Sequence, residues 1–382
     1  MSNSASPSNQ SSCSGEALAS AEKPNVVFIT RKWPPAMGCM ETWAKNLAEQ
    51  LSARSSLELV ALPGRTNGQP PTFFSLLLFP FTVLLHRIKR RPTPDLLILG
   101  DMAIWPLALL FWPLPSRTKL LIAAHGTDVS YHRRGGIKGR FYGLYLRLGA
   151  RLMRRAKVIA NSRATAEVLT ETGWDNSVVV ALATSRSDPT AAPKIENKQS
   201  DAAHRDILFA GRLVTRKGCG WFVKNVLPNL PDNTRLKVAG TGWDQSEQFV
   251  VEHPQVDYLG QLSPKDLRTA YSDADCVIVP NIDVPNGEYE GFGLVAVEAA
   301  EAGAMVLASD HGGLRDAVID GKTGRLIASG DANAWVDAIE SIFAMPAEQQ
   351  ATFRQQAQQV AREYYNWDRV AREVLALAEP GK

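Results

Sequence analysis

Short runs of consecutive apolar residues recur along the chain, separated by longer stretches with helical periodicity. Six runs begin near residues 25, 57, 95, 119, 157 and 178, and six more begin near residues 206, 235, 257, 276, 305 and 324. Runs that are apolar throughout are typical of strands buried on both faces in a parallel sheet. The pattern therefore predicts an α/β protein with two doubly wound domains.

The polar segments around these two sets predict the domain boundaries. Residues 1–23 are Ser-rich and lack an apolar core, so we expect a disordered tail there and no signal peptide. The amino-terminal domain is expected over residues 24–190. A polar, Pro-containing stretch without periodicity predicts a linker at residues 191–205. The carboxyl-terminal domain is then expected over residues 206–365.

Composition narrows the class of protein. The chain has 382 residues, of which 45% are hydrophobic and 21% charged, which excludes collagenous, coiled-coil and fully disordered classes. The longest apolar stretches, 73–85 and 102–115, contain proline and are shorter than the roughly 18 residues that cross a bilayer. Cys13, Cys39, Cys219 and Cys276 form no CxxC pair, so we expect four free thiols, a reducing compartment and no zinc ribbon.

The charge is divided unevenly between the two halves. Residues 1–190 hold 23 Lys and Arg against 12 Asp and Glu, which gives this half a net charge of +11. Residues 191–382 hold 19 Lys and Arg against 27 Asp and Glu, which gives the other half a net charge of −8. Nine of the cations lie between Arg133 and Lys157, a segment without an acidic residue. The halves are therefore expected to meet different partners.

The segment from Glu288 to Gly303 is the richest in candidate chemistry. Gly291 and Gly293 open a helix, and free backbone N–H groups at a helix start suit a phosphate. Glu290 and Glu298 are eight residues apart, roughly 12 Å along a helix, so one could contact a sugar hydroxyl and the other a ribose. The alternative is that Glu298 is a solvated helix residue.

A second cluster follows the strand near residue 206. Arg212 and Lys217 come after that strand, where two cations and a glycine turn could neutralise a diphosphate. No Walker loop or GxGxxG is present. The Gly240-Thr241-Gly242 sequence is explained equally well by a tight turn.

The amino-terminal half offers weaker candidates. Gly38 follows a Pro-Pro pair at a helix start, and His125 and Asp128 follow the fourth strand. A lone histidine at a strand end is more often a packed structural residue. The Asp273-Ala274-Asp275 sequence resembles a metal-binding DxD, but it precedes a buried strand and so lies at the wrong end for a site.

Taken together, these residues resemble glycosyltransferase family 4, from about Asn25 to the carboxyl terminus. The most specific carriers are Glu290-Gly-Phe-Gly-Leu-Val-Ala-Val-Glu298, which matches the family's Glu-x7-Glu signature, and Gly211-Arg212-Leu213 with Lys217-Gly218. The motifs PP…G, HGTD, NSxxT, GRL…KG, GxG, EGFG…E and GGxxD also follow the family's order. The resemblance implies a GT-B fold, in which two Rossmann-like domains face each other across a cleft, and a closing helix at residues 366–382 that crosses back to the amino-terminal domain.

The resemblance also implies residue roles in a retaining, metal-independent transfer from a nucleoside-diphosphate sugar. Arg212 and Lys217 would bind the donor diphosphate, Glu298 the ribose, and Glu290 the transferred sugar. His125 would lie near the reacting carbon. The remaining donor contacts are expected at Gly38, Gly211, Gly240, Gly291, Phe292, Gly293 and Leu294. The family usually has Gly-Gly where this chain has Gly38-Cys39.

Residues 137–155 are the segment that bears on where the acceptor binds. Ile137, Phe141, Leu144, Tyr145, Leu148 and Leu152 share one face of a predicted helix that is otherwise rich in Lys and Arg. Such a helix either lies on an anionic membrane or packs on the core with a solvated basic rim. A second basic cluster comprises Arg87, Lys89, Arg90 and Arg91.

These patterns predict a cytoplasmic hexosyltransferase, at the inner face of the membrane, that uses a UDP- or GDP-sugar and a lipid-linked or polysaccharide acceptor. A soluble acceptor, a non-catalytic sugar-nucleotide-binding protein, an epimerase and a phosphorylase remain alternatives. No cofactor or metal is expected. No nucleic-acid module accompanies the basic segment, so we expect no nucleic-acid partner.

Overall fold

The computed structural model describes residues 23–89, 93–184, 204–242, 244–285 and 287–378. The predicted tail up to residue 22, Cys13 within it, Arg90, Arg91 and the predicted linker up to residue 203 lie outside the described residues.

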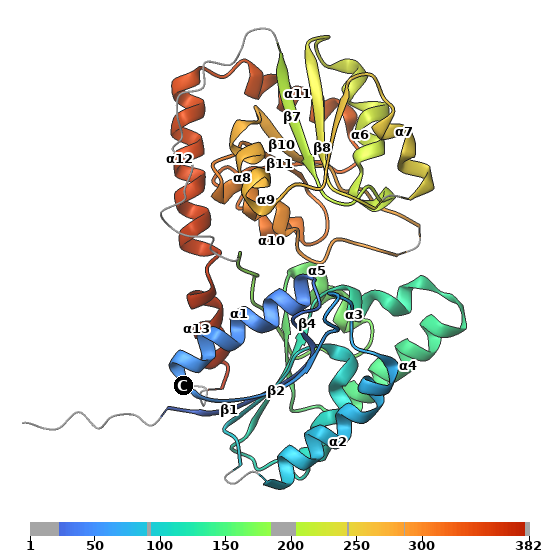
Figure 1. The fold of residues 1–382 in the computed structure, drawn as a ribbon, viewed down its shortest axis with the longest axis vertical. Helices are drawn as coiled ribbons and strands as arrows, with labels where there is room; N and C mark the ends of the chain where they lie inside the picture. Colours follow the sequence, from blue (N-terminus) through green and yellow to red (C-terminus); the bar gives the residue numbers. More distant parts are fainter. Residues whose placement is uncertain (1–22, 90–92, 185–203, 243, 286, 379–382) are drawn as a thin grey trace, which may run out of the picture.

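The amino-terminal half forms a parallel six-stranded sheet with strand order β2-β1-β3-β4-β5-β6 (Figure 1). The strands are β1 (Asn25–Trp33), β2 (Ser56–Pro63), β3 (Leu96–Leu99), β4 (Lys119–Ala124), β5 (Lys157–Ala160) and β6 (Ser177–Val179). Val26 and Phe28 of β1 enter the core on one face, and Val27 and Ile29 enter the core on the other. Burial on both faces is the reason for the continuous apolar runs.

Helices cover both faces of this sheet. On one face lies α1 (Cys39–Arg54), whose Trp43, Leu47 and Leu51 are buried. The other face is covered by α2 (Phe73–Lys89), the 3₁₀ helix η1 (Met102–Phe111), α4 (Gly136–Leu152) and α5 (Arg163–Thr170). The short helices α3 (Thr127–Ser130) and η2 (Tyr131–Arg134) lead into α4.

The carboxyl-terminal half repeats the architecture, with strand order β12-β11-β10-β7-β8-β9. The strands are β7 (Arg205–Ala210), β8 (Thr234–Ala239), β9 (Val256–Gly260), β10 (Cys276–Val279), β11 (Val306–Ser309) and β12 (Arg325–Ile327). All ladders are parallel, so the prediction of two parallel sheets is confirmed. Arg205 belongs to β7 rather than to the predicted linker, because it pairs with Thr234 of β8.

The helices of this half again form two layers. One layer contains α6 (Cys219–Asn225), α7 (Gln248–Val251) and α11 (Ala332–Phe343), and the other contains α8 (Pro264–Asp273), α9 (Leu294–Glu301), α10 (Leu314–Ala317) and α12 (Ala347–Tyr364). The 3₁₀ helices are η4 (Thr215–Lys217), η5 (Leu227–Asn229) and η6 (Gln245–Glu247).

The last helix, α13 (Trp367–Ala376), crosses from the second domain back to the first and packs against α1 (Figure 1). Arg54 of α1 forms an ion pair with Asp368. The Arg369 guanidinium donates to the Ala181 carbonyl at 2.7 Å. Helix α13 therefore packs on the domain that contains β1.

The helix predicted at residues 137–155 is α4. Its apolar face was expected either to pack on the core or to lie on an anionic membrane, and the structure decides against the first. Its buried residues are Gly139, Gly143, Leu146 and Gly149, and a Cβ at Gly149 would lie 2.8 Å from the Trp174 ring. Of the six residues of the predicted apolar face, Ile137, Phe141, Leu144, Leu148 and Leu152 are 48–74% exposed. Tyr145 alone packs on the core, with its Oη donating to the Ala103 carbonyl at 2.8 Å. The alternative that this apolar face as a whole packs on the core is therefore wrong, because the helix approaches the sheet through its glycines. Among the described residues, no helix is long and apolar enough to cross a membrane.

Candidate active site

The strand order of the second sheet brings two distant segments together. β7 lies beside β10, with Cys276 opposite Ile207, although about 70 residues separate them. The chain leaves β7 toward β8 on one side, and it leaves β10 toward β11 on the other. Such a switch point opens a crevice at the carboxyl ends of the strands. The predicted Arg212–Lys217 and Glu288–Leu294 segments both follow these strand ends.

Glu290 is the centre of a cluster of charges in this crevice. Its Oε2 accepts hydrogen bonds from Lys217 Nζ, from Arg216 Nη1 at 2.9 Å and from Asn281 Nδ2 at 3.3 Å. The three charged side chains are only 13–15% exposed. Lys217 and Glu290, both predicted, are thus in direct contact.

The charge state of Glu290 follows from these contacts. Burial raises the pKa of Glu290, but Lys217 and Arg216 outweigh it and hold the pKa at about 2. Glu290 is therefore a carboxylate at any ordinary pH. Its negative charge partly offsets the positive charges that Lys217 and Arg216 present to the crevice.

Arg212 is placed differently from Lys217. It follows Gly211 at the end of β7, is exposed, and makes no ion pair within the described residues. Gly240 ends the neighbouring strand β8, with its carbonyl accepting from Tyr258 Oη at 2.8 Å, and Gly211 N donates to Ala239 O at 2.9 Å. Arg212 is therefore an uncommitted cation at the same edge of the sheet.

The start of α9 supplies backbone donors. Gly293 is the residue before the helix, Leu294 is the first helical residue, and no acidic side chain lies in the first turn. The Phe292 side chain is buried, with its ring 6.2 Å from that of Tyr365. The ring of Phe292 is therefore unavailable to a ligand, and a contact through its backbone amide stays a prediction.

Glu298 is half-buried on the same helix. Burial, with the nearby charge of Glu301, raises the pKa of Glu298 to about 7. Glu298 is therefore not a freely solvated helix residue, because its side chain is half-buried, and this burial is the main cause of the raised pKa.

His125 is held firmly in the first domain. Its Nε2 donates to the Gly100 carbonyl at 2.9 Å, and its ring packs edge-on against Trp43 at 4.8 Å. Its backbone N donates to Asp128 Oδ1 at 2.8 Å. Since Nε2 bonds to a carbonyl, it carries the proton, and Nδ1 remains the acceptor nitrogen.

The two domains touch beside His125. A Cβ on Gly291 would lie 2.6 Å from the His125 carbonyl oxygen, and one on Gly126 would lie 2.9 Å from Gly291 Cα. Only glycine permits this approach, since real Cβ contacts are longer. Tyr289 also bonds Thr165 across the interface at 3.1 Å. The HGTD and EGFG segments are thereby brought together.

Gly38 and Cys39 begin α1 on the first domain. Gly38 has an extended φ of 165°, which any residue can adopt. Cys39 is exposed at the surface of α1. The protein around its sulfur excludes part of the water, and this, with the charges of Glu290 and Glu298, raises the pKa of the thiol. The thiol therefore senses both predicted carboxylates from the opposite domain.

A pocket of about 310 Å³ opens between the domains next to this contact. It is lined by Arg133, Arg163 and Arg315 together with Tyr289 and His311. Within the described ranges, no group of His, Cys, Asp and Glu is gathered to hold a metal. Asp273 and Asp275 lie before β10, at the sheet edge opposite the crevice.

Sequence reasoning missed Arg216 and Asn281. Arg216 precedes the predicted site residue Lys217 in the sequence, which was a signal that it lies near the site. Its pairing with Glu290 depends on β10 lying beside β7. Asn281 follows β10 directly and is 1% exposed. The only sign in the sequence that Asn281 belongs to the site was its position as a polar residue shortly after a predicted strand.

Comparison with known families agrees with this geometry. Residues 25–182 match the model of glycosyltransferase family 4, and residues 204–345 match that of the group 1 glycosyl transferases. The chain combines two glycosyltransferase domains on a GT-B fold.

Relatives of this glycosyltransferase chain match it in part. An uncharacterised glycosyltransferase of Methanocaldococcus jannaschii is 32% identical over 184 residues, which are 44% of this chain and 43% of the relative. The phosphatidyl-myo-inositol mannosyltransferase of Mycobacterium leprae is 31% identical over 183 residues, 46% of each protein. The matches thus span less than half the length of these relatives.

Among solved structures, the Anabaena protein HepE, determined with UDP and glucose, superposes with a TM-score of 0.63 at 18% identity. The superposition covers 93% of this chain and 99% of that protein. At this identity the likeness establishes the fold of both domains and their arrangement, and nothing further.

Proposed function

We propose that this chain is a retaining glycosyltransferase that moves a hexosyl unit from a UDP- or GDP-sugar to a lipid-linked or polysaccharide acceptor. The observation that carries the proposal is the Glu290 cluster with its two cations, set against His125 of the other domain. The glycosyltransferase families of both halves support it.

The donor is proposed to lie along the carboxyl edge of the second sheet. Arg212 and Lys217 would bind the diphosphate, with the amides of Phe292 and Gly293 at the start of α9. Glu298 would accept hydrogen bonds from the ribose. A UDP-bound structural neighbour, HepE, makes UDP a sensible first ligand to test.

The proposed reaction is a front-face substitution without a bound metal. The bond between the anomeric carbon and the phosphate oxygen breaks, and the acceptor oxygen bonds to the same face of that carbon. The acceptor proton passes to the leaving phosphate. Fixed cations and helix amides stabilise the charge that develops on this phosphate, a single such contact being worth about 3 kcal/mol. A trapped glycosyl-enzyme adduct would contradict this scheme.

The acceptor is proposed to enter through the pocket lined by Arg133, Arg163 and Tyr289, which adjoins the contact between the domains. The basic segment Arg133–Lys157 would hold the protein at an anionic membrane, at the inner face of the cytoplasmic membrane. Similarity to a phosphatidyl-inositol mannosyltransferase supports a lipid-linked acceptor.

Thermal unfolding with UDP, GDP, ADP and their sugar conjugates tests the donor site. A nucleotide at 100 times its dissociation constant adds about 2.7 kcal/mol to the free energy of unfolding. Lys217→Ala should lose this stabilisation. Lys322→Ala is the matched control, because Lys322 precedes β12 at the opposite edge of the sheet.

Product analysis then separates the alternatives. Donor hydrolysis or transfer that disappears in Glu290→Ala and Arg212→Ala supports the enzyme. Free epimerised sugar would indicate an epimerase, and a requirement for inorganic phosphate a phosphorylase. If no nucleotide shifts the unfolding of the folded protein, the donor site is refuted.

A further inference from the structure

Most of the exposed apolar surface of the described chain is gathered on two helices. Thirteen of the eighteen large apolar side chains that are exposed belong to α2 or α4. On α2 they are Phe73, Phe74, Leu77, Leu78, Phe81, Leu84, Leu85 and Ile88, at 36–74% exposure. Together the thirteen expose on the order of 1,000 Å², whereas the largest apolar patch of a typical monomer is about 300–600 Å².

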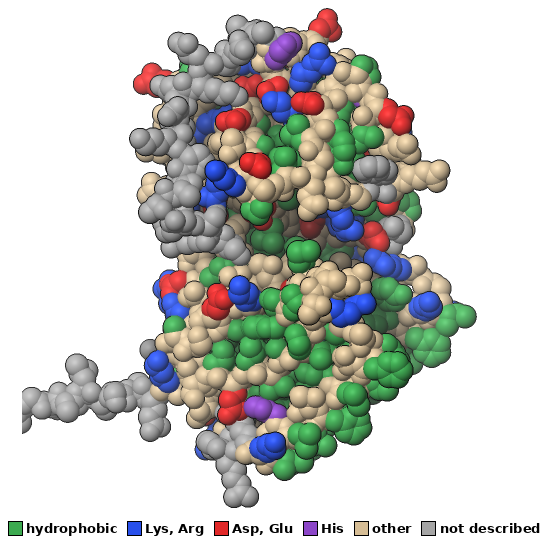
Figure 2. Space-filling model, in the orientation of Figure 1, with side chains coloured by type: hydrophobic (Ala, Val, Ile, Leu, Met, Phe, Trp, Pro, Cys, Tyr) green, Lys and Arg blue, Asp and Glu red, His purple; other side chains and the backbone are tan. Residues whose placement is uncertain are grey.

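The two helices lie on the same side of the first domain. Phe79 and Val83 of α2 and Leu146 of α4 enter one core layer, and η1 contacts both helices. Leu109 of η1 and Trp112 beyond it are also exposed, at 42% and 64%. Figure 2 shows hydrophobic atoms along the lower right edge of the molecule, where Figure 1 places α4 and α2.

Cations flank this apolar face without accompanying acids. Arg147 and Arg151 each precede an exposed leucine of α4 by one residue, so they lie on the flank of the apolar stripe. Neither α2 nor α4 contains Asp or Glu, and Arg87 and Lys89 lie in the last turn of α2. The two helices therefore contribute apolar side chains and positive charge, while the nearest acids come from other elements: Glu58 of β2 pairs with His86 of α2.

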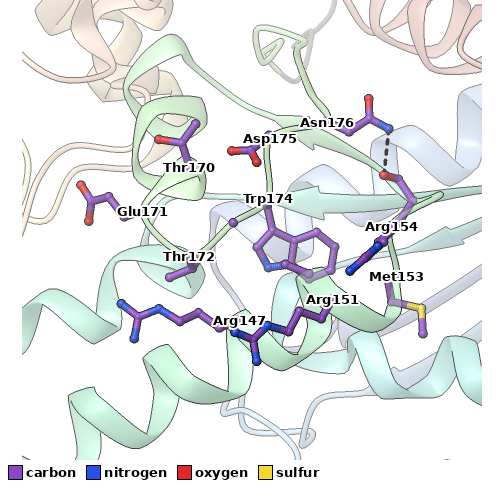
Figure 3. A pocket seen from close by; sticks show the side chains of 13 residues that line it. Arg147, Arg151, Met153, Arg154, Thr170, Glu171, Thr172, Trp174, Asp175 and Asn176 are labelled. Carbon is purple, nitrogen blue, oxygen red and sulfur yellow. Dashed lines mark hydrogen bonds between the residues drawn. The ribbon is translucent and has the colours of Figure 1, made fainter.

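A pocket of about 620 Å³ opens between the arginine flank of α4 and the turn that follows α5, and Glu171 and Asp175 also line it. Arg147, Arg151 and Arg154 surround the Trp174 ring that forms its wall (Figure 3). Trp174 is 3% exposed, with its Nε1 donating to the Leu146 carbonyl at 3.0 Å. Within the described residues these three arginines make no ion pair, so they are available to an anion.

We propose that α2 and α4 form a bilayer-docking face, with the apolar side chains of α2 entering the lipid and the arginines of the Trp174 pocket binding lipid phosphate. This proposal deepens the proposed function. It rests on that function in one respect: a lipid-linked acceptor would be reached at the membrane to which this face binds. The new element is α2, a helix of 17 residues that lies along the surface instead of crossing the bilayer.

Charge complementarity selects an anionic bilayer over a protein partner or a second copy. An apolar face on two helices that carry cations and no acidic residue matches the boundary between acyl chains and anionic headgroups. Exposed Trp112 at its margin suits the same interface. A second copy would place one basic rim against another, since each copy carries the same unpaired cations.

Flotation of the full chain with vesicles tests the proposal. We expect binding to phosphatidylcholine vesicles that contain phosphatidylglycerol, and weak binding without it. Phe74→Ser, Leu77→Ser and Phe81→Ser combined should lower the partition coefficient about 100-fold or more. Arg147→Glu with Arg151→Glu should lower it about 25-fold or more, since each cation contributes about fivefold. Lys265→Glu with Lys322→Glu, the same charge change on the second domain, should leave it unchanged.

Two further measurements complete the test. The serine variant should keep its melting temperature, because the replaced side chains are exposed, and should keep nucleotide binding in solution, which separates this proposal from the donor site. Absence of binding to anionic vesicles at low salt overturns the proposal. So does equal loss in the control variant, or light scattering that shows a dimer which the serine variant dissociates.

Discussion

Replacing Glu290 by Gln should separate nucleotide binding from sugar transfer. In the ligand-free protein, Lys217 and Arg216 both contact Glu290 Oε2. Lowering the pKa of Glu290 from 4.5 to about 2, against the burial that raises it, corresponds to roughly 3 kcal/mol. The two cations together supply at least this much, so moving Lys217 to a diphosphate costs on the order of 1–2 kcal/mol, or about tenfold in affinity.

Glu290→Gln removes that cost, so the nucleoside diphosphate should bind about tenfold more tightly. Transfer should nevertheless fall by about 100-fold to 1,000-fold, because the proposed contact to the sugar is lost. Titration calorimetry with UDP, GDP and ADP measures the first effect, and turnover of the sugar conjugate measures the second. Glu340→Gln, on the exposed face of α11, is the control. If Glu290→Gln weakens nucleotide binding in parallel with transfer, Glu290 does not compete with the diphosphate for Lys217.

Three other outcomes follow from the site. Gly291→Ala places a Cβ 2.6 Å from the His125 carbonyl, so the domains must separate, and kcat should fall about 100-fold, a larger effect than the change in the nucleotide Kd measured by calorimetry. Glu298 is protonated below its pKa of about 7 and accepts ribose hydroxyls fully only as a carboxylate, so nucleotide affinity should rise with pH through that value; a Glu298→Gln variant with the same rise would contradict this role. Among the described cysteines, a maleimide followed by mass spectrometry should label exposed Cys39 and spare buried Cys219 and Cys276. Labelling of Cys39 should still accelerate above pH 9, because the pKa of this thiol is raised, and a donor that fails to slow it does not occupy the cleft beside Cys39.

Much of the fold is readable from the chain because burial on both faces leaves a local mark. Each strand of a covered parallel sheet is apolar at consecutive positions, as in Val26 to Ile29, so twelve strands and two domains are visible without coordinates. The candidate motifs are visible for a related reason. Residues that follow a strand mark its carboxyl end, and Lys217, Glu290 and His125 were all found there.

The pairing of those motifs is a property of strand order, which leaves no local mark. Lys217 meets Glu290 because β10 lies beside β7 instead of beside β9, its predecessor in the chain. The meeting of Gly126 with Gly291 depends further on how the two domains face each other.

The orientation of α4 shows the same division. Its amphipathic sequence determined that this segment would form a helix with one apolar face, and periodicity left open whether that face packs on the core or lies on a membrane. Only the tertiary structure decided that the glycine face packs against Trp105 and Trp174 and that Leu144 and Leu148 point to solvent. The sequence by itself determined which segments are helix or strand and where charge accumulates, because these depend on near neighbours. Which faces meet depends on shape between distant segments, and therefore on the folded chain.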